Sequence, residues 1–170
     1  MTTTVQTQAL PTIEQGAALV ELLSSGNTLS GLLGRSEKSQ EALYHVAYVF
    51  YGQAKYTEAM RMFAFLLANN HLDRRFYMGF AGCMQMLDRH EEALKYYGIA
   101  SLLDLTDPLP PMHMAECHIA MGQRDKARES LEYGLCQGRA ADTHVESVRR
   151  MEGLLALLDG SSNPADSPAH

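Results

Sequence analysis

The chain has 170 residues, of which 46% are hydrophobic and 20% charged, and its formal net charge is −6. A chain this long and apolar can bury a core that offsets the entropy of folding, while its acidic balance argues against nucleic acid and anionic membranes as partners. The three cysteines, the lack of a membrane-length apolar run and the lack of a signal-peptide pattern predict a soluble cytoplasmic protein with reduced thiols.

Residues 1–36 precede the regular part of the chain. Residues 1–11 are rich in Thr and Gln and are predicted to be disordered. Thr12 followed by Gln15 is a capping-box pattern that predicts a helix up to Gly26, and a second, short helix is predicted over residues 28–33. These helices could cap the start of a helical array, but residues 12–36 are more apolar than an end cap requires, which predicts a homodimer through this segment. The residues assigned to dimerisation are Leu19, Leu22, Leu23, Leu29, Leu32 and Leu33.

A 34-residue repeat occupies residues 37–138. Alanine recurs at this spacing at Ala59, Ala93 and Ala127. Another alanine lies twelve residues before each of these, and a large apolar residue lies four residues after each. These two further columns are Ala47, Ala81 and Ala115, and then Phe63, Tyr97 and Leu131. Three columns in register across three copies are typical of a helical repeat array.

Each copy of the repeat is predicted to form two antiparallel helices. Breakers separate the partners at residues 52–55, 88–90 and 122–124, and links this short force each pair to run antiparallel. Since no strand-like alternation competes with this pattern, the fold class is all-α. The expected helices are Glu37–Gln53, Tyr56–Ala68, Asp73–Leu87, Glu91–Leu103, Pro110–Met121 and Asp125–Gln137.

Residues 139–159 follow the third copy and are predicted to cap the array. One apolar face marks a helix from about Asp142 to Asp159, and stacked repeats need their exposed end covered. The residues of this face are Val145, Val148, Leu155 and Leu158. Residues 160–170 are rich in Ser, Pro and Asp and are predicted to be a disordered tail.

The first helix of the first copy carries an apolar stripe besides its packing face. Tyr44, Tyr48 and Tyr51 are spaced four and three residues apart, so their side chains follow one line of the helix. Steps of one repeat length lead from Tyr44 to Met78 and Met112, from Tyr48 to Gly82 and Glu116, and from Tyr51 to Gln85 and Ile119. These side chains either belong to the core or line a concave groove. We interpret them as a groove that binds an extended apolar segment of another protein, because a helix needs a second apolar stripe only where something covers it.

No motif for catalysis or cofactor binding is present. The sequence contains no Walker loop, GxSxG, HExxH or GxGxxG. His113 and Cys117 lie one helical turn apart, but a structural metal site needs four ligands at recognised spacing. Cys83 and Cys117 occupy equivalent repeat positions and are predicted to be buried as small hydrophobic residues. The sequence therefore predicts no enzyme, no metal site and no cofactor.

Several stretches are distinctive beyond the repeat columns. They are Gly26–Leu29, Glu41–Tyr44, Arg75–Gly79, Ala81–Gln85, Leu103–Leu105 with Pro108, and His113–Cys117. The repeat columns resemble the tetratricopeptide repeat, whose helix pairs stack into a right-handed superhelix with one concave face. Together with the flanking helices, these stretches resemble a narrower family, the class II chaperones of bacterial type III secretion, or LcrH/SycD-like translocator chaperones.

This resemblance implies a function and a set of contact residues. Such proteins bind two hydrophobic translocators in the bacterial cytoplasm and keep them soluble and apart before export, and they dimerise through N-terminal helices. An extended client segment lies in the concave groove. Carried over by position, the groove aromatics of the family fall on Tyr44, Tyr48, Tyr51, Tyr56, His71 and Tyr97. The chain departs from the family pattern at Met112 and at Tyr96, which bears on the identity of the client segment.

Two other functions are alternatives to this one. A co-chaperone module that grips an acidic C-terminal peptide would need a clamp of Lys, Asn and Arg in the groove. The corresponding positions hold Tyr44, Tyr48, Gly79, Leu109 and His113, which lack its positive charge. A role as co-regulator of a transcriptional activator is neither supported nor excluded by the sequence, although the acidic balance argues against direct contact with DNA.

Overall fold

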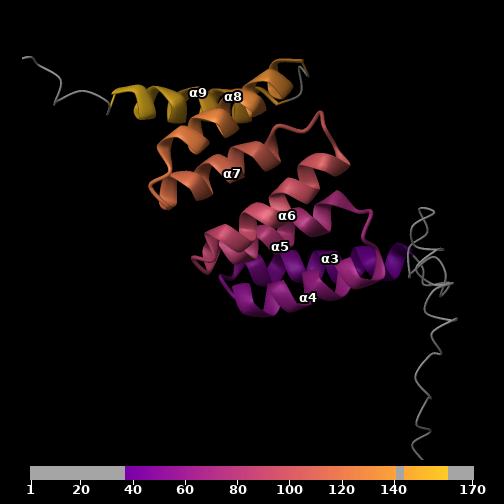
Figure 1. Cartoon of the computed structure of the whole chain (residues 1–170). Coiled ribbons are helices and arrows are strands. Elements are labelled where there is room, and N and C mark those ends of the chain that lie inside the picture. Colours follow the sequence, from indigo (N-terminus) through magenta and orange to yellow (C-terminus); the bar gives the residue numbers. More distant parts are fainter. Residues whose placement is uncertain (1–36, 141–143, 161–170) are drawn as a thin grey trace, which may run out of the picture.

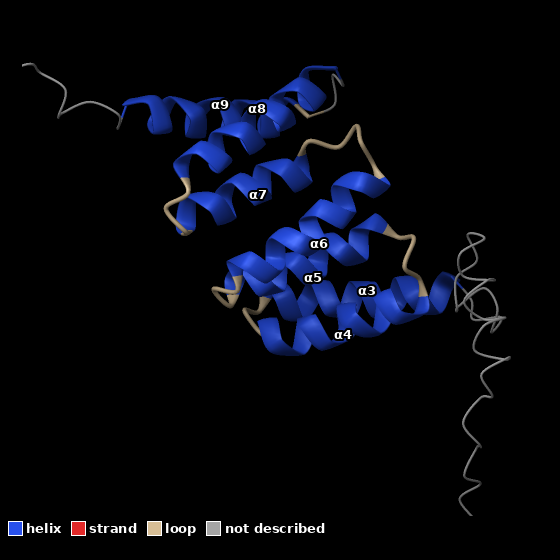
Figure 2. Cartoon of the chain, in the orientation of Figure 1, coloured by secondary structure: helices blue, strands red, loops and turns tan. Residues whose placement is uncertain are grey.

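The computed structural model describes residues 37–140 and 144–160, and within these residues the chain forms helices and no strand (Figure 2). The predicted N-terminal helices, the six leucines assigned to dimerisation and the predicted tail from residue 161 onward lie outside the described residues. The helices are α3 (Glu37–Gly52), α4 (Tyr56–Asn69), α5 (Arg74–Met86), α6 (His90–Leu103), α7 (Leu109–Ala120), α8 (Arg124–Ala140) and α9 (Val145–Gly160).

The helices stack in chain order as antiparallel pairs. α3 packs on α4, α5 on α6 and α7 on α8, and each pair contacts the next through α4 with α5 and α6 with α7. The pair α3–α4 lies at one end of the stack, and α9 lies against α8 at the other end (Figure 1). The predicted all-α array of three helical repeats is confirmed.

The three repeat columns of the sequence form the core. All six alanines of the two small columns have no exposed surface. The bulky column is equally buried, with Phe63 and Leu131 at 0% exposure and Tyr97 at 2%. The small side chains allow two helix backbones to approach, and the bulky one fills the space beside them, so a regular spacing in sequence becomes a repeated packing unit.

The links between partner helices also repeat. Ala54, Asp88 and Gly122 occupy equivalent positions of the three copies, and they adopt positive φ angles of 58°, 58° and 71°. In each link the next backbone N–H bonds to a carbonyl five residues earlier, as Lys55 does to Phe50 at 3.0 Å. This left-handed residue ends the first helix of each pair and turns the chain back onto it.

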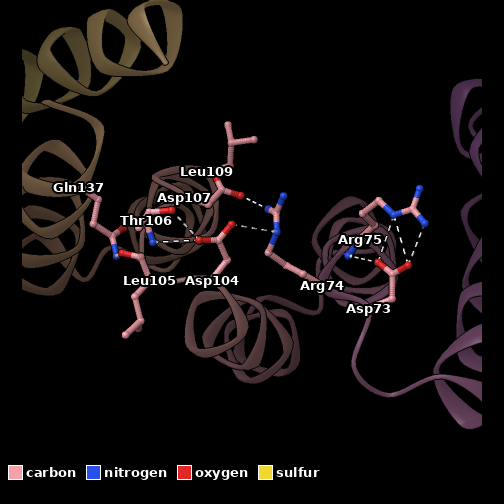
Figure 3. A network of polar contacts seen from close by, with 9 residues as sticks. All are labelled: Asp73, Arg74, Arg75, Asp104, Leu105, Thr106, Asp107, Leu109 and Gln137. Atoms are coloured by element: carbon pink, nitrogen blue, oxygen red, sulfur yellow. Dashed lines mark hydrogen bonds and ion pairs between the residues drawn. The ribbon is translucent and has the colours of Figure 1, made fainter. Parts of the chain in front are cut away.

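The connection from α6 to α7 is held by side chains from both neighbouring pairs (Figure 3). Asp107, which is 3% exposed, accepts a hydrogen bond from Arg74 of α5 and another from the backbone N–H of Leu109 at 2.9 Å. From the other side, Gln137 of α8 donates to the carbonyl of Leu105 at 2.6 Å. The second and third pairs are therefore joined by a fixed link rather than by helix packing alone.

The last helix covers the open end of the third pair. Met151 has no exposed surface and Leu158 is 8% exposed, and both belong to one core cluster with Leu131 and Leu135 of α8. α9 therefore supplies the covering helix that the sequence predicts for this end of the array. It begins at Val145, three residues later than expected.

Candidate functional site

A groove runs along the first helices of the three pairs. It encloses about 550 Å³ and is lined by side chains from α3 to α7 and from α9. Its lining residues are Tyr44, Tyr48, Tyr51, Phe63, Arg74, Arg75, Met78, Gly79, Gly82, Gln85, Met86, Tyr97, Leu109, His113, Glu116 and Arg150. The groove therefore has an aromatic part toward α3 and a polar part toward α7 and α9.

The aromatic part is built on the tyrosine stripe of α3. The ring centroids of Tyr44 and Tyr48 lie 5.7 Å apart, and those of Tyr48 and Tyr51 lie 6.2 Å apart. Tyr44 also contacts the rings of Phe63 and Phe76 at 6.0 and 5.8 Å. Burial raises the pKa of the Tyr44 and Tyr51 phenols, whereas Tyr48 is 56% exposed. These rings offer a wide apolar surface with hydroxyl groups at its edge.

Two glycines of α5 give the groove its depth. A Cβ atom at Gly79 would lie 2.3 Å from the ring of Phe63, so only glycine admits that ring. A Cβ atom at Gly82 would lie 3.4 Å from the ring of Tyr51, at the limit of comfortable contact. The aromatic side chains thus lie directly against the backbone of α5, and the space above them stays open.

The polar part is organised by the carboxylate of Glu116. It accepts hydrogen bonds from Gln85 at 3.1 Å, from His113 at 2.9 Å and from Arg150 of α9 at 2.6 Å, while the Tyr97 hydroxyl donates to Gln85 at 2.7 Å. Burial alone would raise the pKa of Glu116, but the hydrogen bonds from His113 and Gln85 and the charges of His113 and Arg150 lower it below the ordinary value. The carboxylate therefore stays ionised and joins three helices, α5, α7 and α9, while the bond from Tyr97 to Gln85 extends the network to α6.

Two further arginines reach the groove, and both are paired. Arg75 lies 4.8 Å from the ring centre of Tyr44 and contacts Asp73 at 2.8 Å and Glu41 at 3.1 Å. Arg74 pairs with Asp107. The groove thus does contain cations, from positions outside the co-chaperone clamp, but carboxylates of this chain balance them. No observation favours an acidic peptide as the ligand.

Six of the ten residues predicted to contact a client line this groove. They are Tyr44, Tyr48, Tyr51, Met78, Gln85 and Tyr97. The exposed fraction differs among them, because Tyr97 is nearly buried and offers only the base of the groove. The structure therefore brings together the tyrosine stripe and its repeat equivalents on α5.

Four predicted residues lie elsewhere. Met112 was expected on the groove floor but is 4% exposed and packs in the core cluster with Leu131 and Met151, because α9 covers the third pair. Ile119 is 36% exposed and lies outside the lining. Tyr56 contacts the ring of Tyr51 at 5.4 Å without reaching the groove, and His71 lies half-buried in the link from α4 to α5.

The sequence reasoning missed the polar groups of the lining. Arg74, Arg75 and Arg150 lie in no repeat column, and Arg150 comes from α9, outside the repeats. Glu116 lies one repeat beyond Gly82, so the spacing did place it on the groove side, but its partners from α5 and α9 are not readable from spacing. The sequence did carry a signal for the depth of the groove, because Gly79 and Gly82 mark a close approach of other groups to the backbone of α5.

The remaining predictions concern thiols, metals and membranes. Cys83 and Cys117 are fully buried, as predicted, and burial raises the pKa of each thiol to about 12. Over residues 37–140 and 144–160, no three His, Cys, Asp or Glu side chains gather in a way that could hold a metal ion. Among the helices described, none has the length and apolar character to cross a bilayer.

Comparison with known proteins identifies the family. No family model matches the chain. The chain is 30% identical to the low calcium response locus protein H of Yersinia pestis over 127 residues, which are 75% of this chain and 76% of that protein. The chain belongs to the LcrH/SycD-like family. The similarity in sequence covers most of both chains, so the likeness is not limited to the repeat motif.

Several solved structures superpose on the chain. A type III secretion complex from Aeromonas hydrophila matches with a TM-score of 0.81 at 27% identity and covers 85% of this chain and 97% of that one. PcrH bound to the chaperone-binding region of PopD matches with a TM-score of 0.72 at 29% identity and covers 75% of this chain and 96% of that one. The Yersinia enterocolitica chaperone SycD bound to a peptide of the translocator YopD matches with a TM-score of 0.71 at 26% identity and covers 75% of this chain and 98% of that one. A crystal structure of SycD in an alternative dimer also superposes on the chain.

Proposed function

We propose that this chain is a cytoplasmic chaperone of a type III secretion system that holds an extended apolar segment of a translocator protein in its concave groove. The observation that carries the proposal is the open, tyrosine-lined groove on the first helices of the three pairs. Family members PcrH and SycD bind segments of the translocators PopD and YopD, which supports the same class of client here.

The chemistry of the groove fits such a client. An extended segment presents alternate side chains, and the rings of Tyr44 and Tyr51 with Met78 provide an apolar floor for them. Each buried apolar side chain contributes roughly 1.5–3 kcal/mol before the cost of ordering the segment. The polar part around Glu116 can hydrogen-bond to the peptide backbone. A groove of this kind shelters a sequence that would otherwise aggregate.

The proposal includes a homodimer and excludes catalysis as the role. Structures of SycD as a dimer support self-association within the family. The apolar N-terminal segment, which precedes α3, is the proposed dimer contact. The relatives are chaperones, so this chain is proposed to act by binding and not by turnover.

Replacing Tyr48 with alanine tests the groove. Tyr48 is the most exposed of the three tyrosines, so its removal leaves the buried core intact and, besides the client contact, takes away only its ring contacts with Tyr44 and Tyr51. We expect a tenfold or greater loss of affinity for a translocator peptide, in line with about 1.5–3 kcal/mol for one buried aromatic side chain. Isothermal titration with a synthetic segment from a translocator of the same genome measures this loss.

The matched control is Tyr133→Ala. Tyr133 is 49% exposed on α8 and lies outside the groove lining, so its removal should leave the affinity unchanged. The combined replacement of Tyr44, Tyr48 and Tyr51 should abolish co-purification of a co-expressed translocator. Unchanged affinity in Tyr48→Ala together with unchanged co-purification in the triple variant, with helical content retained, would rule out the groove as the client site.

A further inference from the structure

A second stripe of α3 is uncovered. Ala42, Val46 and Val49 follow one line of the helix at spacings of four and three residues, on the side away from the tyrosine stripe. Val46 is 41% exposed and Val49 is 45% exposed, and Ala42 is exposed as well. Two valines side by side on a helix surface form an apolar face that lacks a partner among the described residues.

The repeat register shows what normally covers this face. Steps of one repeat length from the stripe lead to Phe76, Phe80 and Cys83 on α5, and to Pro110, Met114 and Cys117 on α7. Phe76 is 1% exposed, and Cys83 and Cys117 are fully buried. They are covered because α4 packs on α5 and α6 packs on α7. The stripe on α3 is bare because no second helix of an earlier pair precedes it in the described part of the chain.

The apolar surface of α3 continues into a hollow between α3 and α4. This hollow encloses about 420 Å³ and has an almost wholly apolar lining, with Leu43, Phe50, Met62 and Phe65 as its main side chains. Phe65 is 50% exposed. The end of the stack formed by α3 and α4 (Figure 1) is thus apolar over both helices, unlike the other end, which α9 covers.

The sequence before α3 carries the columns of a covering segment. Steps of one repeat length back from Ala59, Phe63 and Leu66 lead to Ser25, Leu29 and Leu32, which are small, bulky and bulky in the same order. In the described pairs, Phe63 and Leu66 share one core cluster with Phe76 of the next helix. We propose that residues 25–33 dock on the uncovered face of α3 in the same chain, with Leu29 and Leu32 against Val46 and Val49.

The length of the link favours this segment over a second copy of the chain. In the described array, links of four and five residues (70–73 and 104–108) join one pair to the next. The link between the docking segment and α3, residues 34–36, is similarly short. A tether this short gives the segment an effective concentration in the millimolar range, which a second copy does not reach at cellular levels. Leu29, Leu32 and Leu33 are then engaged within the chain, which leaves Leu19, Leu22 and Leu23 for dimerisation.

The reactivity of a thiol at position 49 tests the covering. In a Val49→Cys variant of the full chain, docking should shield the new thiol from a maleimide, while the exposed Cys136 reacts freely as an internal reference. We expect Leu29→Ser to speed the reaction at position 49 by roughly tenfold or more, which corresponds to about 1.4 kcal/mol of docking free energy. The matched change Leu19→Ser should leave the rate as it was.

Equal rates of maleimide reaction at positions 49 and 136 in the Val49→Cys variant, or no effect of Leu29→Ser on the rate at position 49, would overturn the docking. Translocator binding by these variants is a separate readout. Val49 lies on the opposite side of α3 from the groove, so failure of the docking and failure of the proposed function remain distinguishable.

Crosslinking decides whether the cover comes from the same chain. Phe63 packs against Gly79, and the equivalent positions one repeat earlier are Leu29 and His45. In a Cys136→Ser background, Leu29→Cys with His45→Cys should give an internally bridged monomer with a short bifunctional maleimide. Ser30→Cys with His45→Cys, one residue out of register, should give much less. A covalent dimer would assign the face to a second copy, and equal yields from the two pairs would also overturn the proposal.

Discussion

At the scale of single residues, the depth of the groove depends on a missing side chain. Gly79 lies on α5 where the ring of Phe63, fully buried, contacts the helix backbone. The ring cannot move aside, because Tyr44 and Phe76 pack against it. Any side chain at position 79 must therefore displace the ring or push the helices apart, and either change alters the floor on which a client segment would lie.

Gly79→Ala should lower the free energy of unfolding by about 1–3 kcal/mol, as overpacking does in a filled core. The matched control is Gly98→Ala on α6, where a Cβ atom would have nothing within 4 Å and should raise stability by roughly 0.5–1 kcal/mol through helix propensity. Urea unfolding at neutral pH measures both. An equal and small effect of the two substitutions would mean that Phe63 can yield.

At the scale of helices, the repeat spacing predicted every boundary of α3 to α8 within three residues. The prediction of Tyr56–Ala68 became Tyr56–Asn69, and Asp73–Leu87 became Arg74–Met86. This accuracy has a physical cause, because each turn must supply a left-handed residue such as Gly122 and each helix must present its alanine column. The exposure of a side chain was harder to predict where it depends on contacts between repeats. Met112 shares its repeat position with Tyr44, but it is buried because α9 packs over the third pair.

The link between α6 and α7 shows how elements of different repeats are fixed to one another. Asp107→Ala should lower the free energy of unfolding by about 2–3 kcal/mol, because it leaves Arg74 without its buried partner and removes the hydrogen bond to the first turn of α7. Asp159→Ala, which breaks an exposed pair with Arg128, is the matched control and should cost less than about 1 kcal/mol. Chemical denaturation followed by circular dichroism compares the two. Similar losses would mean that the link adds nothing beyond helix packing.

At the scale of the whole molecule, the array is a row of pairs in which each pair is stabilised by its neighbours. The third pair has α6 on one side and α9 on the other. Met151 and Leu158 of α9 are buried against α8, and Arg150 carries the groove network to Glu116. The last helix therefore both closes the core and forms one wall of the groove, so a loss at this end should weaken the third pair before the first two.

Ending the chain after residue 144 should therefore release the third pair selectively. Loss of Met151 and Leu158 removes about 1.5–3 kcal/mol of burial for each side chain and exposes Leu131 and Leu135 to water. Hydrogen exchange read by mass spectrometry should show faster exchange in α7 and α8, with α3 to α6 retaining more of their protection, because local opening follows the missing contacts. A chain ending after Gly160 is the matched control and should exchange like the full chain. Uniform loss of protection over all helices would instead mean that the repeats fold as one cooperative unit, and unchanged protection in α7 and α8 would mean that α9 is not their cover.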